Sequence, residues 1–303
     1  MISMSNINKH RLPDFFCLGV AKSGTTTLHH ALIQHPDIFL PAIKETFFFS
    51  SDNNYKKGTE WYLEQYFSKS ERKAQIGEIA STYTYHGERV ARRLKSLYGQ
   101  HPVKFIIVFR DPVKRAYSHY WHLRRLGWEK KTFRNAVDLE NKRRETQIRR
   151  NLKSGRARLA YIESGLYASR IRPFLERFER EQFLFLLFED ITNGYDKAIN
   201  RILKFLGLPV FSLSYEHRNE AKISANIQTM YWARSKRIKA VTRKNIPDGL
   251  RHIVGEIFGF HRMRSFDYPP LQKDLEAELR EVFEPEVTEL SKIIDRDLSH
   301  WLP

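Results

Sequence analysis

Several features are scarce or missing in this sequence. It has one cysteine, Cys17, so no disulfide can form within the chain, and the surrounding run FFCLGV predicts a buried thiol in a reducing compartment. No apolar stretch reaches the roughly 18 residues of a membrane-spanning helix, and the polar start MISMSNINKHRLPD lacks a signal-peptide core. These absences predict a soluble, cytoplasmic protein without a transmembrane segment.

Acidic residues are also in short supply. The chain has 35 Asp and Glu against 52 Lys and Arg, which gives a formal charge of +17. Such a field attracts anions, so we expect an anionic ligand or substrate. Nucleic acid is a weaker hypothesis, because no nucleic-acid-binding module is recognisable and we expect no such partner. The basic stretch 141–158 fits either a solvated helix or a contact surface for an acidic acceptor.

Metal-binding patterns are missing as well, since His, Cys and carboxylates do not cluster at metal-ligand spacing, so we expect no metal cofactor. Four apolar runs do occur, and they lack polar alternation, as strands buried on both faces do. These runs are Phe15–Val20, Gln75–Ile79, Lys104–Phe109 and Phe183–Phe188. Helical patterns separate them over residues 25–35, 59–68, 87–98, 113–126 and 166–180. This alternation predicts an α/β fold with a doubly wound parallel sheet.

The C-terminal part reads as helical after residue 190, with a turn at 245–249 and a final amphipathic helix that Pro285 should break or kink. We expect a polar tail over residues 1–13 and a single domain over residues 14–303. In a doubly wound sheet, ligands bind beyond the carboxyl ends of the strands. Two segments stand at such positions, AKSGTTT after the first strand and RDPVKRAYS after the third.

The segment AKSGTTT resembles a phosphate-binding loop without matching the nucleoside-triphosphate pattern. In that pattern the lysine follows the second glycine, whereas here Lys22 precedes Gly24. Gly24 still permits a tight turn, and the amides that follow open a helix whose N-terminus favours an anion. The neighbouring hydroxyls could bind phosphate or could merely cap the helix. A P-loop kinase or NTPase therefore stays open as an alternative function.

The second segment begins with Arg110 at the end of its strand. Pro112 suits the first turn of the next helix, and Ser118 lies about two turns into it. An arginine grips phosphate through charge-assisted hydrogen bonds, and a serine adds a hydroxyl donor. The alternative is an ion pair between Arg110 and Asp111 with a surface serine.

Together the two segments resemble the nucleotide-binding motifs of sulfotransferases that use 3′-phosphoadenosine-5′-phosphosulfate (PAPS), and the resemblance extends from about residue 14 to the C-terminus. It implies the P-loop-like sulfotransferase fold and PAPS as the co-substrate. It also implies that Lys22 contacts the oxygen that bridges sulfur and phosphorus, and that Arg110 and Ser118 bind the 3′-phosphate. The residues it places around the 5′-phosphate are Ser23, Gly24, Thr25, Thr26 and Thr27. Lys222 corresponds to a loop that closes over the nucleotide, although a solvated lysine fits this position too.

The resemblance also implies an acceptor side. In the carbohydrate branch of the family, which includes heparan-type enzymes, a glutamate before an aromatic pair is the general base, and Glu45 matches it. His86 is the alternative, because other branches use a histidine. The implied reaction is in-line transfer of a sulfuryl group to a hydroxyl or amine of a carbohydrate or glycoconjugate. Several carbohydrate enzymes have a lysine directly after the glutamate of a segment like GEIASTY, where this chain has Ile79, so heparan specificity does not transfer directly.

Overall fold

The computed structural model describes residues 11–70, 73–140, 142, 153, 159–211, 222–224, 263–265 and 268–303, with the backbone alone for 222–224 and 263–265. Its main sheet has five parallel strands in the order β2-β3-β1-β4-β5. These strands are β1 (Phe15–Gly19), β2 (Ile38–Phe39), β3 (Gln75–Ile79), β4 (Lys104–Phe109) and β5 (Phe183–Leu187). A separate antiparallel pair is formed by β6 (Lys222–Ser224) and β7 (Met263–Ser265).

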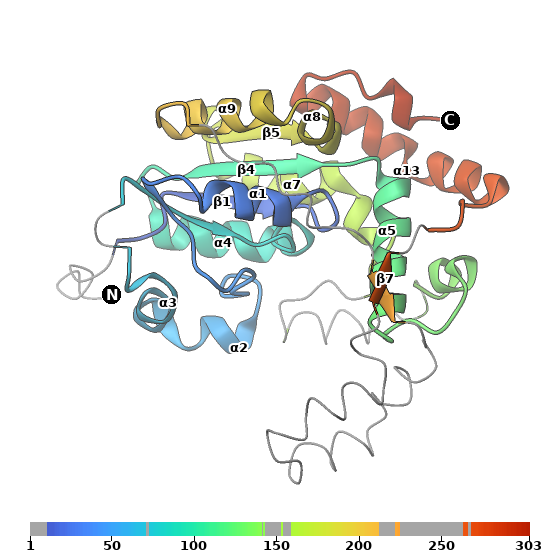
Figure 1. Cartoon of the computed structure of the whole chain (residues 1–303), viewed down its shortest axis with the longest axis horizontal. Coiled ribbons are helices and arrows are strands. Elements are labelled where there is room, and N and C mark those ends of the chain that lie inside the picture. The colour runs from blue at the N-terminus through green and yellow to red at the C-terminus, as the bar shows by residue number, and fades with distance from the viewer. Residues whose placement is uncertain are drawn as a thin grey trace, which may run out of the picture.

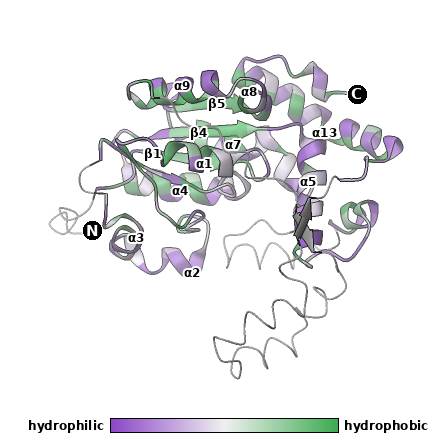
Figure 2. Ribbon diagram, viewed as in Figure 1, coloured by the Kyte–Doolittle hydropathy of each residue, from purple (hydrophilic) through white to green (hydrophobic). Residues whose placement is uncertain are grey.

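The central strands are apolar on both faces, because helices cover both sides of the sheet. Along β1, Phe15 and Cys17 belong to one buried cluster, whereas Phe16 and Leu18 belong to the other. The alternation of side chains across a strand sends successive residues to opposite faces, so an unbroken apolar run is required here. In Figure 2, β4 and β5 are accordingly coloured hydrophobic along most of their length.

Figure 1 shows the two helical layers on either side of the sheet. One face packs against α1 (Thr25–Leu32), α8 (Phe188–Asn193) and α9 (Tyr195–Leu206). The other face packs against α3 (Gly58–Phe67), α4 (Gly87–Tyr98), α5 (Pro112–Arg125), α7 (Tyr167–Leu175) and α13 (Lys273–Ile294). A short helix, α2 (Asp52–Tyr55), precedes α3, and the 3₁₀ turn η2 (Thr84–His86) precedes α4. The predicted doubly wound parallel sheet is confirmed.

Two details differ from the expectation. The strand β2 was not predicted, because two residues are too short for a recognisable period. The helix α13 continues through Pro285, so of the predicted break or kink the break does not occur. Buried residues before and after the proline, Phe283 and Val287 among them, pack into one core, and this tertiary packing offsets the lost backbone hydrogen bond.

Several predicted features fall outside the described residues. They are most of the polar tail, the turn at 245–249 and, apart from positions 142 and 153, the basic stretch 141–158. Cys17 is fully buried, as predicted, and burial raises the pKa of its thiol to about 12. Within the described ranges, no helix is long and apolar enough to cross a membrane.

Candidate active site

The segment between β1 and α1, residues 20–27, forms a tight loop at the carboxyl edge of the sheet, called here the lysine loop. Lys22 and Gly24 both adopt left-handed backbone conformations, with φ of 77° and 83°. A β-carbon on Gly24 would lie 3.3 Å from the ring of Phe188, so glycine serves both the conformation and the close packing. The predicted turn is therefore confirmed, with Lys22 at its centre.

The start of α1 is open to an anion. Gly24 occupies the cap position, and no side chain makes a capping hydrogen bond there, so the capping role considered for the hydroxyls is not observed. The hydroxyl of Ser23 is buried and has no hydrogen-bond partner in the described part of the chain. A buried hydroxyl without a partner is costly in a folded protein, which is typical of a group that meets a ligand.

Arg110 lies directly after β4, as predicted, and reaches the lysine loop. Its Nη1 donates to the backbone oxygen of Lys22 at 2.9 Å, and its guanidinium stacks on the ring of Phe188 at 4.5 Å. Asp111 turns instead to the start of α5, where it accepts hydrogen bonds from the backbone amides of residues 113 and 114. Ser118 is buried nearly two turns into α5. The two predicted anion-binding segments thus converge on one region.

Positive charge accumulates around Lys22. Burial lowers the pKa of Lys22 to about 8, and the positive charges of Arg125, Arg110 and Lys44 lower it further. Burial, Lys22 and Arg125 also lower the pKa of His122 to about 3. Among the described residues, neither Lys22 nor Arg125 has a carboxylate within ion-pair distance. Two neighbouring cations that lack a counter-charge, Lys22 and Arg125, mark a site that binds an anion.

Glu45 lies next to the lysine loop. Its Oε1 accepts hydrogen bonds from the amide and the hydroxyl of Ser81 at 3.0 and 2.5 Å, and Lys44 Nζ lies 3.6 Å away. Its Oε2 is buried and has no hydrogen-bond partner within the described ranges. One oxygen is therefore fixed by the protein, and the other remains able to accept a proton.

Lys44 links the two halves of the site. Its Nζ donates to the hydroxyls of Thr25 and Thr26, each at 3.1 Å, and it also lies beside Glu45. This ammonium group therefore stands between the lysine loop and the carboxylate. Thr27 is half-buried on the first turn of α1.

The two remaining candidates from the sequence are His86 and Lys222. His86 is buried at the end of η2, with its ring 4.8 Å from that of Tyr85. Lys222 begins β6 and pairs with Ser265, but its side chain lies outside the described part of the structure. Within the described ranges, no group of three or more His, Cys, Asp or Glu could hold a metal ion.

Sequence reasoning missed three residues of this site. Lys44 directly precedes Glu45 but was given no role, and Ser81 lies within GEIASTY without having been singled out. Arg125 could have been found by its spacing, because it is seven residues after Ser118 and so shares a face of α5. The contacts of Lys44 and Ser81 depend on how the chain folds between residues 40 and 50, and no local pattern reveals that.

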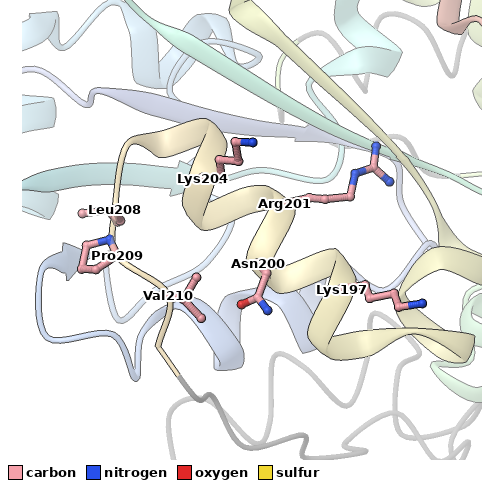
Figure 3. Close-up of a pocket in the computed structure, with 7 residues that line it drawn as sticks. All are labelled: Lys197, Asn200, Arg201, Lys204, Leu208, Pro209 and Val210. Carbon is pink, nitrogen blue, oxygen red and sulfur yellow. The ribbon is translucent and has the colours of Figure 1, made fainter.

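A groove of about 630 Å³ lies elsewhere, along α9. Figure 3 shows the residues that line it, Lys197, Asn200, Arg201, Lys204, Leu208, Pro209 and Val210. The carbonyl of Phe205, near the end of α9, accepts a hydrogen bond from Lys104 at the start of β4. The groove therefore extends toward the amino-terminal edge of the sheet, whereas the lysine loop follows the carboxyl edge.

The comparisons with known proteins agree with this geometry. The sequence model of the sulfotransferase domain matches residues 12–291. The chain therefore belongs to the sulfotransferase domain family. A solved structure of a sulfotransferase from Alicyclobacillus acidocaldarius superposes with a TM-score of 0.67 and 26% identity, covering 96% of this chain and 99% of that one. The predicted P-loop-like sulfotransferase fold is thereby confirmed.

Two curated relatives are heparan sulfate enzymes. The human bifunctional heparan sulfate N-deacetylase/N-sulfotransferase 3 is 26% identical over 302 residues, which cover 96% of this chain and 31% of that protein. The mouse heparan sulfate glucosamine 3-O-sulfotransferase 3B1 is 31% identical over 206 residues, which cover 67% of this chain and 48% of that protein. The chain thus spans 31% and 48% of the length of these two relatives.

Proposed function

We propose that the protein transfers a sulfuryl group from PAPS to a hydroxyl or amine of a carbohydrate or glycoconjugate. The observation that carries this proposal is the convergence of Lys22, Arg110 and Lys44 around an open helix start, beside a carboxylate with one unpartnered oxygen. The cations suit a nucleotide with phosphates at two positions, and the carboxylate suits a base. One relative named above is a heparan sulfate N-sulfotransferase and the other is a heparan sulfate glucosamine 3-O-sulfotransferase, which supports an amine or a hydroxyl on a sugar as the acceptor.

In this reaction Glu45 Oε2 takes the proton of the acceptor group as that oxygen or nitrogen attacks sulfur. The new bond to sulfur forms while the bond between sulfur and the bridging oxygen breaks, and the electron pair leaves with the 5′-phosphate. Lys22 stabilises the charge that develops on this departing oxygen. Lys44, between the threonine hydroxyls and Glu45, neutralises charge on the group in transfer.

The direct test supplies ³⁵S-labelled PAPS and desulfated heparan sulfate to the purified protein. We expect label in the polysaccharide and an equal amount of 3′-phosphoadenosine-5′-phosphate (PAP). Magnesium-dependent hydrolysis of ATP, without label transfer from PAPS to this or any other sugar, would instead support the kinase or NTPase alternative.

The lowered pKa of Lys22 predicts that nucleotide binding takes up a proton. Below about pH 8 the free protein already carries the charged ammonium group, whereas above pH 8 the proton must come from solvent. Affinity for PAP should therefore fall as the pH rises through about 8, and proton uptake should increase. Calorimetry in two buffers of different ionisation enthalpy measures this uptake. Lys22→Arg is the matched control, because arginine stays protonated at these pH values; equal uptake by both proteins would contradict the assignment.

Arg110 is predicted to recognise the 3′-phosphate. Arg110→Ala should weaken PAP binding by about 10- to 150-fold, the equivalent of a lost charge-assisted hydrogen bond of about 1.5–3 kcal/mol. Binding of adenosine 5′-monophosphate, which has no 3′-phosphate, should change little. The exposed Arg172 on α7 gives the control variant Arg172→Ala. Equal losses for both nucleotides would show that Arg110 acts on the lysine loop and not on the 3′-phosphate.

A further inference from the structure

A second carboxylate, Glu78, is buried close to the proposed base. It lies near the end of β3 with 1% of its surface exposed. Its Oε1 accepts hydrogen bonds from the hydroxyls of Thr46 at 2.6 Å and Tyr83 at 2.7 Å, and its Oε2 accepts one from the hydroxyl of Tyr62. Three hydroxyl groups from separate parts of the chain thus converge on one carboxylate.

Thr46 connects this cluster to the backbone that carries Glu45. Its two neighbours, Glu45 and Phe47, both have left-handed backbones, with φ of 66° and 54°. Such conformations cost about 1–3 kcal/mol each in non-glycine residues and persist only where the surroundings enforce them. The Thr46 side chain binds Glu78 and accepts from the amide of Phe48, while the Thr46 carbonyl accepts from Asn54 at 2.9 Å. The hydroxyl of Thr46 is therefore one anchor of the strained segment, and it joins this segment to Glu78.

Burying the carboxyl group of Glu78 lowers the stability of the folded protein at neutral pH. Burial raises the pKa of Glu78 to about 7, although its hydrogen bonds from Thr46, Tyr62 and Tyr83 lower it, and the charge of Glu45 adds to the rise. The other titratable groups that interact with it are the phenols of Tyr66 and Tyr98. Since the pKa is raised above the value of an unfolded chain, the folded state loses stability as the pH rises through about 7. The stability of the fold therefore does not by itself account for a carboxyl group at position 78.

We propose that Glu78 is a positioning residue that holds Glu45, through Thr46, in the orientation in which Oε1 meets Ser81 and Oε2 is left without a protein partner. This inference rests on the proposed role of Glu45 as the base. The chain of contacts is continuous: Glu78 binds Thr46, Thr46 fixes the left-handed segment, and the Ser81 amide donates to Glu45 Oε1 at 3.0 Å. The Ser81 amide therefore reports the position of the Glu45 side chain.

Amide hydrogen exchange of the full chain, without nucleotide or acceptor, tests the connection. Thr46→Val keeps the shape of the side chain and removes its hydroxyl, so exchange at Ser81 should accelerate by about tenfold or more. Thr46→Ser restores a hydroxyl and should return exchange toward the wild-type rate. The amides of β4 serve as the control for global stability. Unchanged exchange at Ser81, or equal acceleration at Ser81 and in β4, would overturn the proposal.

Glu78→Gln separates positioning from stability. The amide oxygen can still accept from the hydroxyls of Thr46 and Tyr83, whereas the amide NH2 group replaces the oxygen that accepts from Tyr62. The remaining hydrogen bonds are neutral and weaker, so Ser81 exchange should again accelerate. Its unfolding temperature at pH 8 should equal or exceed that of the wild type, and the difference should grow as the pH rises from about 5 to 8. A lower unfolding temperature at pH 8 would instead mean that Glu78 serves stability. PAP binding is measured on each protein: a wild type that binds no PAP refutes the proposed function, whatever the exchange data show.

Discussion

Replacing Glu45 with glutamine is expected to lower sulfuryl transfer by about 10²–10⁴-fold, the range typical of a lost general base. The amide keeps the size of the side chain and its contact with Ser81, but it cannot accept the acceptor's proton. Affinity for PAP should stay close to that of the wild type, because the nucleotide contacts arise from the lysine loop and Arg110. The measurement is single-turnover transfer from ³⁵S-labelled PAPS, with PAP binding followed separately.

A matched control is Glu64→Gln, which changes an exposed carboxylate on α3. It should transfer at the wild-type rate. If Glu45→Gln transfers as fast as this control, Glu45 is not the base, and His86→Ala becomes the variant to examine. If Glu45→Gln loses both transfer and PAP binding, the carboxylate supports the nucleotide site instead of the acceptor.

Replacing Lys22 with alanine is expected to reduce turnover by about 10²–10³-fold, comparable to the loss of one group aimed at developing charge. Lys22 lies at the centre of the tight turn, and its ammonium group is buried among other cations, where a charge interacts strongly with a ligand. The effect should be larger on single-turnover transfer than on PAP affinity, because the charge on the departing oxygen is greatest as the bond to sulfur breaks.

Lys44→Ala is the informative comparison, since it removes a neighbouring ammonium group that contacts the loop through Thr25 and Thr26. It should slow transfer less than Lys22→Ala does. Near-normal turnover of Lys22→Ala would remove the role assigned to this lysine, and a larger loss in Lys44→Ala would move that role to Lys44.

The sheet could be predicted because buried strands leave a strong signal. Runs such as KFIIVF are apolar at every position, as both faces of β4 require, and the helix starts carry clear markers such as Pro112. The strand β2 left no such signal in two residues. The continuity of α13 through Pro285 could not be predicted either, because the packing of its apolar side chains offsets the missing hydrogen bond, and that packing is tertiary.

The site was predictable where its residues lie directly after strands. The lysine loop follows β1, and Arg110 follows β4. Their lysine, hydroxyl and arginine side chains indicate an anion-binding site where two such segments meet at one edge of the sheet. The contacts of Lys44 and Ser81 in the site depend on the left-handed backbone at Glu45 and Phe47, which turns the chain back toward the lysine loop. Non-glycine residues in that conformation follow from surrounding contacts, and a sequence pattern does not specify them.

The central claim is that the cations around Lys22 bind a nucleotide with separate 3′- and 5′-phosphates. Isothermal titration calorimetry of the purified protein with PAP, at pH 7 and low salt, tests it most directly. The account predicts saturable binding at one site per chain, weakened by salt and by Arg110→Ala. No binding at high micromolar PAP, or binding equally tight to adenosine 5′-monophosphate, would contradict it.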